Sequence, residues 1–182
     1  VRMDVDEAGR AALAANPQVV AVHEDVLRRP LTQSSLAYIG ASRWHAEGHV
    51  GYGTSVAVLD SGIRYWNGYF GDCPERGTDP ATGEDCRVRV FEGFAHLEFG
   101  AGITDPYQVA EQEPHATNVG GIVAGMAPGT DLISLGVFAV YEPDSSTGFG
   151  GGAAANDADV TAALDWCIDH REEFNIVSAN MS

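Results

Sequence analysis

A run of six residues from Ser55 to Asp60 constrains the fold more than any other stretch. Its sequence, Ser-Val-Ala-Val-Leu-Asp, is apolar at four consecutive positions and lacks the alternation of a half-exposed strand. Such a run predicts a strand buried on both faces, as in a parallel sheet that helices cover on both sides. Asp60 would then lie at the carboxyl end of a buried strand.

Further segments follow in an order that extends this sheet. The predicted strands are residues 87–91, 131–138 and 175–181, and the predicted helices are residues 115–125 and about 157–170. Strands that alternate with helices favour parallel βαβ units. The expected fold class is therefore α/β, with a mostly parallel sheet in three α/β/α layers.

The last predicted helix has a cap and an apolar stripe. Asp157 or Asp159 would cap it. The stripe consists of Val160, Ala163, Leu164, Cys167 and Ile168. Residues 100–113 and 142–156 are predicted loops, and the second is rich in Gly and Ser.

The first 30 residues predict a separate β-α-β piece. Residues 1–5 and 18–24 favour strands, and Asp4 or Asp6 could cap a helix over residues 7–15 that ends at Asn16-Pro17. This piece is too small to bury its own apolar face, so it needs another surface to pack against. Residues 28–35 are polar and predict a linker.

His115 and Asp60 carry the chemistry that the sequence suggests. A histidine is the simplest general base near neutral pH, and a carboxylate bonded to its ring holds the correct tautomer. His115 opens a helix that leads into the next strand, so it can lie at the sheet edge where ligands of such sheets bind. Taken singly, a solvated Asp60 and a His115 that only begins a helix are the simpler interpretation. We favour the pair.

Two cysteines flank an irregular loop. Cys73 and Cys86 enclose residues rich in Pro, Gly and acidic side chains. They could be two reduced thiols on a surface loop, but we favour a disulfide, which would indicate an oxidising compartment. Cys167, on the last predicted helix, would be the unpaired cysteine.

Composition excludes some classes of function. The formal net charge is −16, which disfavours binding to nucleic acid, and no apolar run approaches the ~20 residues that span a bilayer. The acidic residues of the cysteine loop could hold calcium, but their spacing matches no calcium-binding template. We therefore assign no metal site, and calcium stays a candidate ligand only.

Taken together, the motifs resemble those of the subtilisin-like serine proteases (subtilases). The aspartate motif is VAVLDSGI at residues 56–63, and the histidine motif is HATNVGGIVAGMAPGTDLISLGVF at residues 115–138. The helix DADVTAALDWCID and the strand IVSANMS follow in the family's order. The resemblance covers residues 36–182, including the run YIGASRWHAEGHVGYGTSVAVLD before the first catalytic residue.

The resemblance implies a serine endopeptidase with Asp60 and His115 as two members of a Ser-His-Asp triad. Its substrates would be proteins or peptides. Gly150, Gly151 and Gly152 would lie on a strand that pairs with an extended substrate, and Ser182 would begin one wall of the specificity pocket. The nucleophile and the oxyanion asparagine would lie beyond Ser182, so this chain alone is expected to be inactive.

Residues 1–30 resemble the C-terminal half of a subtilase propeptide. The resemblance implies a partial ferredoxin-like β-α-β segment that inhibits the catalytic domain at residues 31–182 until it is removed. It also implies a secreted or extracytoplasmic protein.

Departures from the family's pattern leave alternatives open. The family usually has His-Gly-Thr-His where this chain has His115-Ala116-Thr117-Asn118. A catalytically inactive pseudoprotease or a propeptide-like binding module would also keep the fold. A metal hydrolase is the weakest alternative, because no third ligand has suitable spacing near Asp60 and His115.

Overall fold

The computed structural model describes residues 6–19 and 36–182. Contacts divide the chain into two units, Val1–Leu31 and Thr32–Ser182. The interpretation of the first unit as a propeptide stays a prediction. Among the described residues, no helix has the length and apolar character that crossing a bilayer would require.

The first unit contains helix α1, Glu7–Ala14. Of the two candidate caps, Asp6 begins the helix, because its side chain accepts a hydrogen bond of 2.7 Å from the Gly9 amide. The predicted strand at residues 1–5 and the linker at residues 28–35 lie outside the described residues. So does the strand predicted from residue 18 onward, except for Gln18 and Val19, which form no strand. The ferredoxin-like arrangement therefore stays a prediction.

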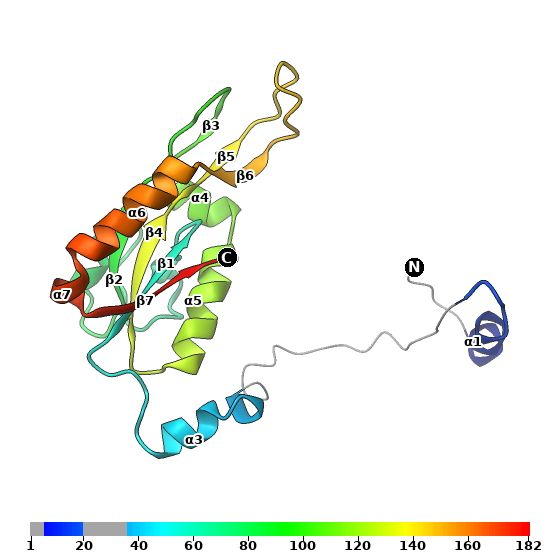
Figure 1. Ribbon diagram of the computed structural model, residues 1–182, viewed down its shortest axis with the longest axis horizontal. Helices are drawn as coiled ribbons and strands as arrows, with labels where there is room; N and C mark the ends of the chain where they lie inside the picture. The colour runs from blue at the N-terminus through cyan, green and yellow to red at the C-terminus, as the bar shows by residue number, and fades with distance from the viewer. Residues whose placement is uncertain (1–5, 20–35) are drawn as a thin grey trace. The chain divides into compact units, whose positions relative to one another are not determined.

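The second unit is built on a four-stranded parallel sheet (Figure 1). Its strands, in the order in which they lie side by side, are β2 (Val88–Gly93), β4 (Asp131–Gly136), β1 (Ser55–Asp60) and β7 (Ile176–Met181). All three pairings are parallel. The sequence prediction of a mostly parallel α/β sheet is confirmed.

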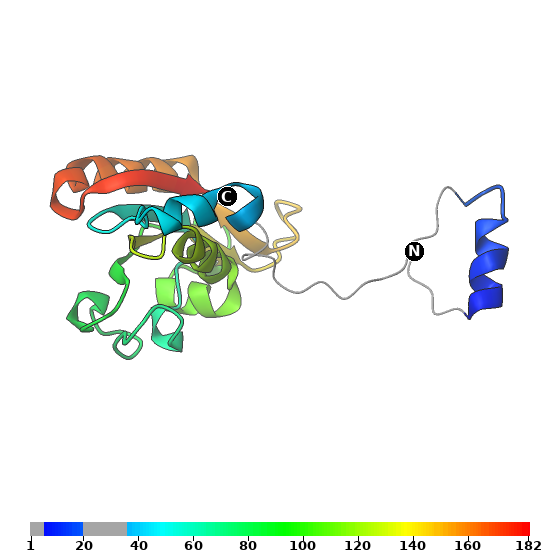
Figure 2. The ribbon, with the colours of Figure 1, turned by 90° about the horizontal axis from the view of Figure 1, so that it is seen from below.

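Helices cover both faces of this sheet (Figure 2). Along β1, Ala57 and Leu59 pack toward α6 (Asp157–Asp169), whereas Val58 packs toward α5 (His115–Met126). Successive side chains of a strand point to opposite faces, so a run without polar residues fills both cores. The three-layer architecture follows directly from the apolar run that we recognised in the sequence.

A second, antiparallel sheet extends from the end of β4. Its strand order is β3 (Gly102–Ile103), β5 (Phe138–Tyr141) and β6 (Gly152–Ala155). The prediction of one strand over residues 131–138 was wrong, because the chain leaves the parallel sheet after Gly136 and begins β5 at Phe138. Residues 135–141, which include the break, carry no charged side chain and no turn of polar residues, so their pattern does not mark it. The predicted loop at residues 142–156 also contains β6.

Helix α4, Pro106–Gln112, corrects the predicted loop at residues 100–113. The Asp105 side chain accepts hydrogen bonds from the amides of Tyr107 at 2.9 Å and Gln108 at 3.0 Å. Proline at the first helical position is common after such a cap. The Asp105-Pro106 pair was therefore a usable signal for this helix.

The cap of α6 differs from the prediction, whereas Val160, Ala163, Leu164 and Cys167 of the predicted stripe do face the core and only Ile168 does not. Asn156, rather than Asp157 or Asp159, is the residue that precedes the first turn. Ile168 is 71% exposed, because the buried line of the helix runs through Asp159, Ala163 and Cys167. The remaining helical elements are α3 (Ala41–Ala46), α7 (Arg171–Phe174) and the short 3-10 turns η1 (Tyr65–Asn67) and η2 (Pro80–Thr82).

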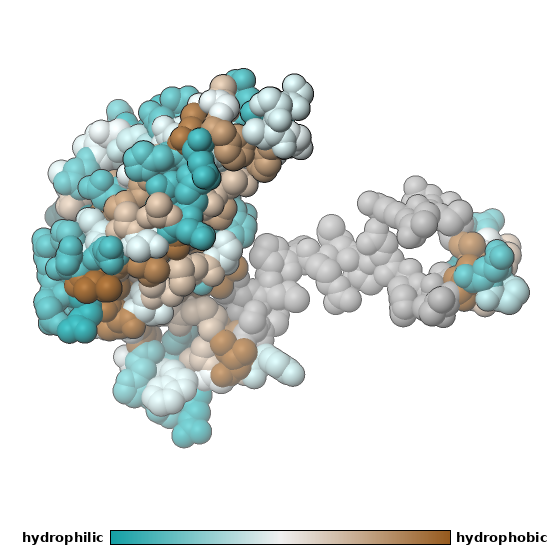
Figure 3. All heavy atoms as spheres, turned by 45° about the horizontal axis from the view of Figure 1, so that its top comes forward, coloured by the Kyte–Doolittle hydropathy of each residue, from teal (hydrophilic) through white to brown (hydrophobic). Residues whose placement is uncertain are grey.

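Hydrophilic and hydrophobic side chains are interspersed on the surface. Hydrophilic side chains cover much of the face shown in Figure 3, and hydrophobic areas lie between them.

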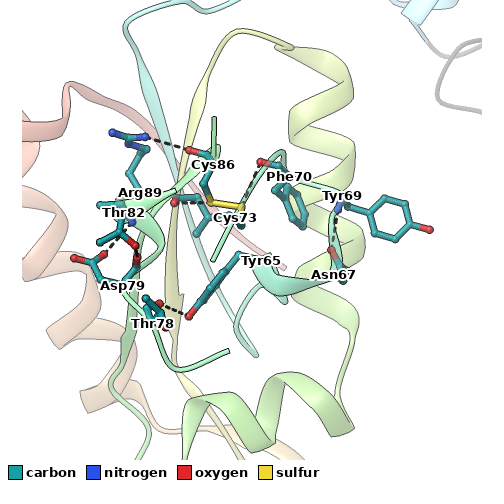
Figure 4. Close-up of a disulfide and its surroundings, with 12 residues drawn as sticks. Tyr65, Asn67, Tyr69, Phe70, Cys73, Thr78, Asp79, Thr82, Cys86 and Arg89 are labelled. Atoms are coloured by element: carbon teal, nitrogen blue, oxygen red, sulfur yellow. Dashed lines mark hydrogen bonds between the residues drawn. A yellow bond between two sulfur atoms is a disulfide. The ribbon is translucent and has the colours of Figure 1, made fainter. Parts of the chain in front are cut away.

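Cys73 and Cys86 form a disulfide beneath the loop that they flank (Figure 4). Cys86 and Phe70 are buried in the core cluster on the α5 side, and the Tyr65 hydroxyl donates a hydrogen bond of 2.6 Å to the Thr78 carbonyl. Cys167 is a free, buried cysteine. The disulfide thus attaches an otherwise irregular loop to the core.

Reduction of the disulfide should destabilise the second unit. The cysteines are 13 residues apart in the sequence, and a crosslink over such a loop stabilises by about 3 kcal/mol through the entropy of the unfolded chain. Urea unfolding followed by tryptophan fluorescence, with and without dithiothreitol, measures this difference. Cys167→Ala is the control, since it removes the free thiol and should respond to reductant as the native chain does. An unchanged midpoint in the native chain would contradict the prediction.

Candidate active site

Asp60 lies at the carboxyl end of β1, at the edge of the parallel sheet. Its side chain is only 1% exposed, and its carbonyl oxygen accepts a hydrogen bond of 2.8 Å from the Val137 amide. The second sheet begins at Phe138, so both sheets meet next to this residue. A carboxylate at this depth requires hydrogen-bonding partners, because burying an unpaired charge is costly.

His115 is the principal partner of Asp60. It is the first residue of α5, and its Nδ1 lies 2.7 Å from Asp60 Oδ2. An ionised carboxylate can only accept, so the hydrogen lies on Nδ1 and leaves Nε2 free to take a proton. The His115 side chain is 56% exposed whereas that of Asp60 is 1% exposed, so the imidazole connects a buried charge to solvent.

Ser61 links the end of β1 to the beginning of α5. Its amide donates to Asp60 Oδ1 at 2.6 Å, and its hydroxyl donates to the Glu113 carbonyl at 2.6 Å. The same hydroxyl accepts a bond of 3.3 Å from the Ala116 amide. Ser61 was assigned no role from the sequence, although its position directly after Asp60 was a signal that it lies beside the pair. Ser61 holds the histidine helix against the aspartate strand.

Arg64 holds the corner between α4 and α5. Its amide donates to Thr117 Oγ1 at 3.0 Å, and its guanidinium donates to the carbonyls of Ala110 at 2.7 Å and Glu111 at 2.5 Å. The last carbonyls of a helix lack partners within the helix, so an arginine there stabilises the end of α4. Arg64 was not recognised from the sequence, because its contact with the end of α4 depends on how the loop after β1 folds.

The other end of α5 is capped by side chains. Arg87 donates to the carbonyls of Ala124 at 3.3 Å, Ala127 at 2.9 Å and Thr130 at 2.7 Å, and His45 Nε2 lies 2.8 Å from the Met126 carbonyl. Burial lowers the pKa of Arg87, and the nearby Asp131 carboxylate opposes this effect. Cationic groups also suit the negative end of the helix dipole.

The departures from the family's histidine motif leave the pair in place. Ala116 is fully buried in the core cluster on the α5 side, so its extra methyl group has room. Asn118 is exposed, and among the described residues its side chain forms no hydrogen bond with His115 or Asp60. The two substitutions therefore do not by themselves remove the arrangement.

The residues suggested for substrate binding do not all lie on strands: Gly152 is in β6, but Gly150 and Gly151 precede it, contrary to the prediction, and Ser182 follows β7. Gly152 begins β6 and pairs with Tyr141, and Gly151 has a positive φ of 82° that favours glycine. Ser182 follows β7, where Asn180 Nδ2 donates to its hydroxyl at 3.2 Å. Met181 pairs with Leu59, so Ser182 lies near the sheet edge that carries Asp60. Their role in binding a substrate stays a proposal.

The structure offers no metal centre within residues 6–19 and 36–182. No group of three or more His, Cys, Asp or Glu side chains in these ranges is arranged to hold a metal ion.

Comparison with known proteins finds similarity to subtilisins. No protein-family model matches the chain. It is 28% identical to subtilisin E of Bacillus subtilis over 145 residues, and 29% identical to subtilisin J of Geobacillus stearothermophilus over 149 residues. The chain is thus similar in sequence to several subtilisins.

The likeness to subtilisins covers most of this chain but little of the relatives. The match to subtilisin E spans 73% of the chain and 32% of that protein, and the match to subtilisin J spans 78% and 33%. The chain therefore corresponds to about a third of the length of these relatives.

Removing the Ser61 hydroxyl should loosen the subtilisin-like site. Ser61→Ala leaves the partly buried Glu113 carbonyl and the buried Ala116 amide without their partner, which costs about 1–3 kcal/mol. Urea unfolding measures this loss, and the ¹⁵N chemical shifts of the His115 ring report the change at the pair. Ser178→Ala, an exposed serine on β7, is the matched control and should alter neither quantity. Equal stability of Ser61→Ala and the native chain would refute the linking role.

Proposed function

We propose that this chain supplies the aspartate and the histidine of a subtilisin-like serine endopeptidase. The observation that carries the proposal is the 2.7 Å contact between His115 Nδ1 and the buried Asp60 carboxylate, in a chain related to subtilisins. Asp60 orients the ring and stabilises the imidazolium, and His115 Nε2 takes the proton of the nucleophile and returns it to the leaving group.

The nucleophile and the oxyanion donor would come from residues beyond this sequence. Ser61 is the serine nearest in sequence to the pair, but its hydroxyl is engaged by Glu113 and Ala116. Ser134 is fully buried and its Oγ accepts a hydrogen bond from the Ile63 amide. The match to only a third of each relative supports a longer protein that completes the triad.

The substrate class would be extended peptide segments of proteins. Strand β6 lies at one end of the antiparallel sheet and pairs only with β5 among the described strands. A peptide could add to its other edge through main-chain hydrogen bonds, and small residues there permit close approach. Gly150, Gly151 and Gly152 would contribute to this edge, and Ser182 to one wall of the specificity pocket.

A zymogen exported to an oxidising compartment would fit these features. The Cys73–Cys86 disulfide supports a secreted or extracytoplasmic site of action, since such bonds persist mainly in oxidising environments. The residues before the linker would act as the propeptide, an intramolecular inhibitor of the catalytic part. Calcium remains without an assigned site.

Substitution of either proposed triad member should abolish most of the activity of the complete protein. The full reading frame that contains this chain should hydrolyse fluorogenic peptides and react with a fluorophosphonate probe. Asp60→Asn should lower kcat by about 10⁴-fold, because the neutral amide favours the wrong tautomer of His115, and His115→Ala by at least a similar factor. Steady-state kinetics measure both changes, and the 182-residue chain alone should show no turnover.

Matched controls separate this mechanism from loss of folding. Asp165→Asn on the exposed face of α6 and His49→Ala near α3 should keep kcat within about twofold of the native protein, as is usual for exposed substitutions. If the complete protein neither hydrolyses peptides nor reacts with the probe, the protease assignment is wrong. A pseudoprotease or binding module, the alternative that the His-Ala-Thr-Asn motif suggested, would then be favoured.

A further inference from the structure

A second His–Asp pair lies away from the proposed triad. His96, in the segment that follows β2, has its Nδ1 2.7 Å from Asp159 Oδ1, and its amide donates to Asp159 Oδ2 at 2.9 Å. Asn156 Nδ2 donates to the His96 carbonyl at 3.0 Å and to Asp159 Oδ2 at 3.3 Å. We call these three residues the His96 cluster. It attaches residues 94–99 to the first turn of α6.

The same segment is also held by the middle strand of the antiparallel sheet. The Tyr141 hydroxyl donates to the His96 carbonyl at 3.3 Å and accepts from the Glu98 amide at 3.3 Å. The Phe99 ring stacks on Tyr141 with centroids 5.1 Å apart. Residues 96–99 therefore contact both β5 and α6. Strand β5 pairs with β6, and α6 follows β6 in the sequence.

The position of the His96 cluster relative to β6 suggests its role. Strand β6 ends at Ala155, and Asn156 follows directly. Since β6 pairs with one strand only among those described, its order depends strongly on how its ends are held. Asp159 is buried, whereas its partner His96 is 80% exposed at the side chain, so solvent can protonate the ring.

We propose that His96 and Asp159 are positioning residues for β6, and that protonation of His96 tightens their hold on this strand. The inference rests on the proposed function in one respect, namely that β6 is the strand to which an extended peptide would add. The ordering of β6 by the His96 cluster can be tested without any substrate.

Charges around the ring support this dependence on protonation. The hydrogen bond to Asp159 raises the pKa of His96. Burial alone would raise the pKa of Asp159, but the bonds from His96 and Asn156 outweigh it and the pKa falls. Glu98 and Asp157 line the open pocket that His96 also lines. The Tyr141 hydroxyl bonds to the His96 carbonyl rather than to the ring.

The sign of the effect follows from these directions. A histidine whose pKa is raised by folding contributes its stabilisation fully below its unfolded pKa of about 6.5, and the contribution is lost as the pH rises through the folded value. Asp159, with a lowered pKa, keeps its charge until the pH falls below the ordinary range of about 3.9. The hold on β6 should thus be strongest in mildly acidic solution and weaker in alkaline solution.

Hydrogen–deuterium exchange of this chain tests the proposal. His96→Asn keeps an N–H donor near the position of Nδ1 but cannot be protonated, so it isolates the effect of charge. Relative to His96→Asn at the same pH, the native amides of residues 152–156 should exchange roughly five- to tenfold more slowly at about pH 5.5, and at an equal rate at about pH 8.5. Comparison at equal pH cancels the intrinsic pH dependence of exchange.

A second pair of variants distinguishes the cluster from general fraying of α6. Asp159→Asn should accelerate exchange at residues 152–156 on the order of tenfold at about pH 5.5, and should lower the His96 pKa measured by NMR. Thr161→Ala removes a bond of 2.7 Å from Thr161 Oγ1 to the Asp157 carbonyl in the same helix turn, and should leave β6 unchanged.

Two outcomes would overturn the proposal. One is an exchange rate for residues 152–156 in the native chain that matches His96→Asn at both pH values. The other is an acceleration in Thr161→Ala equal to that in Asp159→Asn. Failure of the protease assignment would instead leave these exchange rates as expected while the complete protein lacks hydrolytic activity, so the two failures can be told apart.

Discussion

The buried carboxylate of Asp60 is the constraint on which the site depends. It lies at the end of a strand whose neighbours are apolar on both faces, where an unpaired charge would be costly. The His115 ring and the Ser61 amide satisfy its two oxygens at 2.7 and 2.6 Å. If α5 moved away from β1, Asp60 Oδ2 would lose its hydrogen bond to His115 and would remain buried among apolar side chains. The aspartate therefore links the stability of this edge to the position of the histidine.

Helix α5 is held at both ends, and this explains how the pair can keep its geometry. Ser61 and Arg64 bond to the first turn and to the corner before it, whereas Arg87 and His45 bond to the carbonyls at its end. These contacts come from segments far apart in the sequence. Such support matters chemically, because a general base acts only within hydrogen-bond reach of the proton that it abstracts. A site on a packed helix keeps this distance better than one on a free loop.

Within the part of the chain that the structure describes, two histidine–aspartate contacts of equal length have different surroundings. His115 and Asp60 lie where two sheets meet at the carboxyl edge, with the imidazole open to solvent, which suits proton transfer. His96 and Asp159 lie at the start of α6 and are surrounded by bonds that connect three segments, which suits positioning. The same type of hydrogen bond can thus support proton transfer at one site and hold segments of the chain in position at another. What distinguishes the two is the element that each aspartate anchors.

The sequence alone determined the parallel sheet, its two covering helices and the meeting of Asp60 with His115. An uninterrupted apolar strand must be covered on both faces, and strands joined by helices bring their carboxyl ends to one edge. The tertiary structure decided the split of residues 131–141 between two sheets, the exposure of Ile168 and the contacts of Ser61, Arg64, Arg87 and His96. A local pattern records whether a residue is apolar or polar. It does not record which distant carbonyl or carboxylate a folded loop will bring within hydrogen-bond distance.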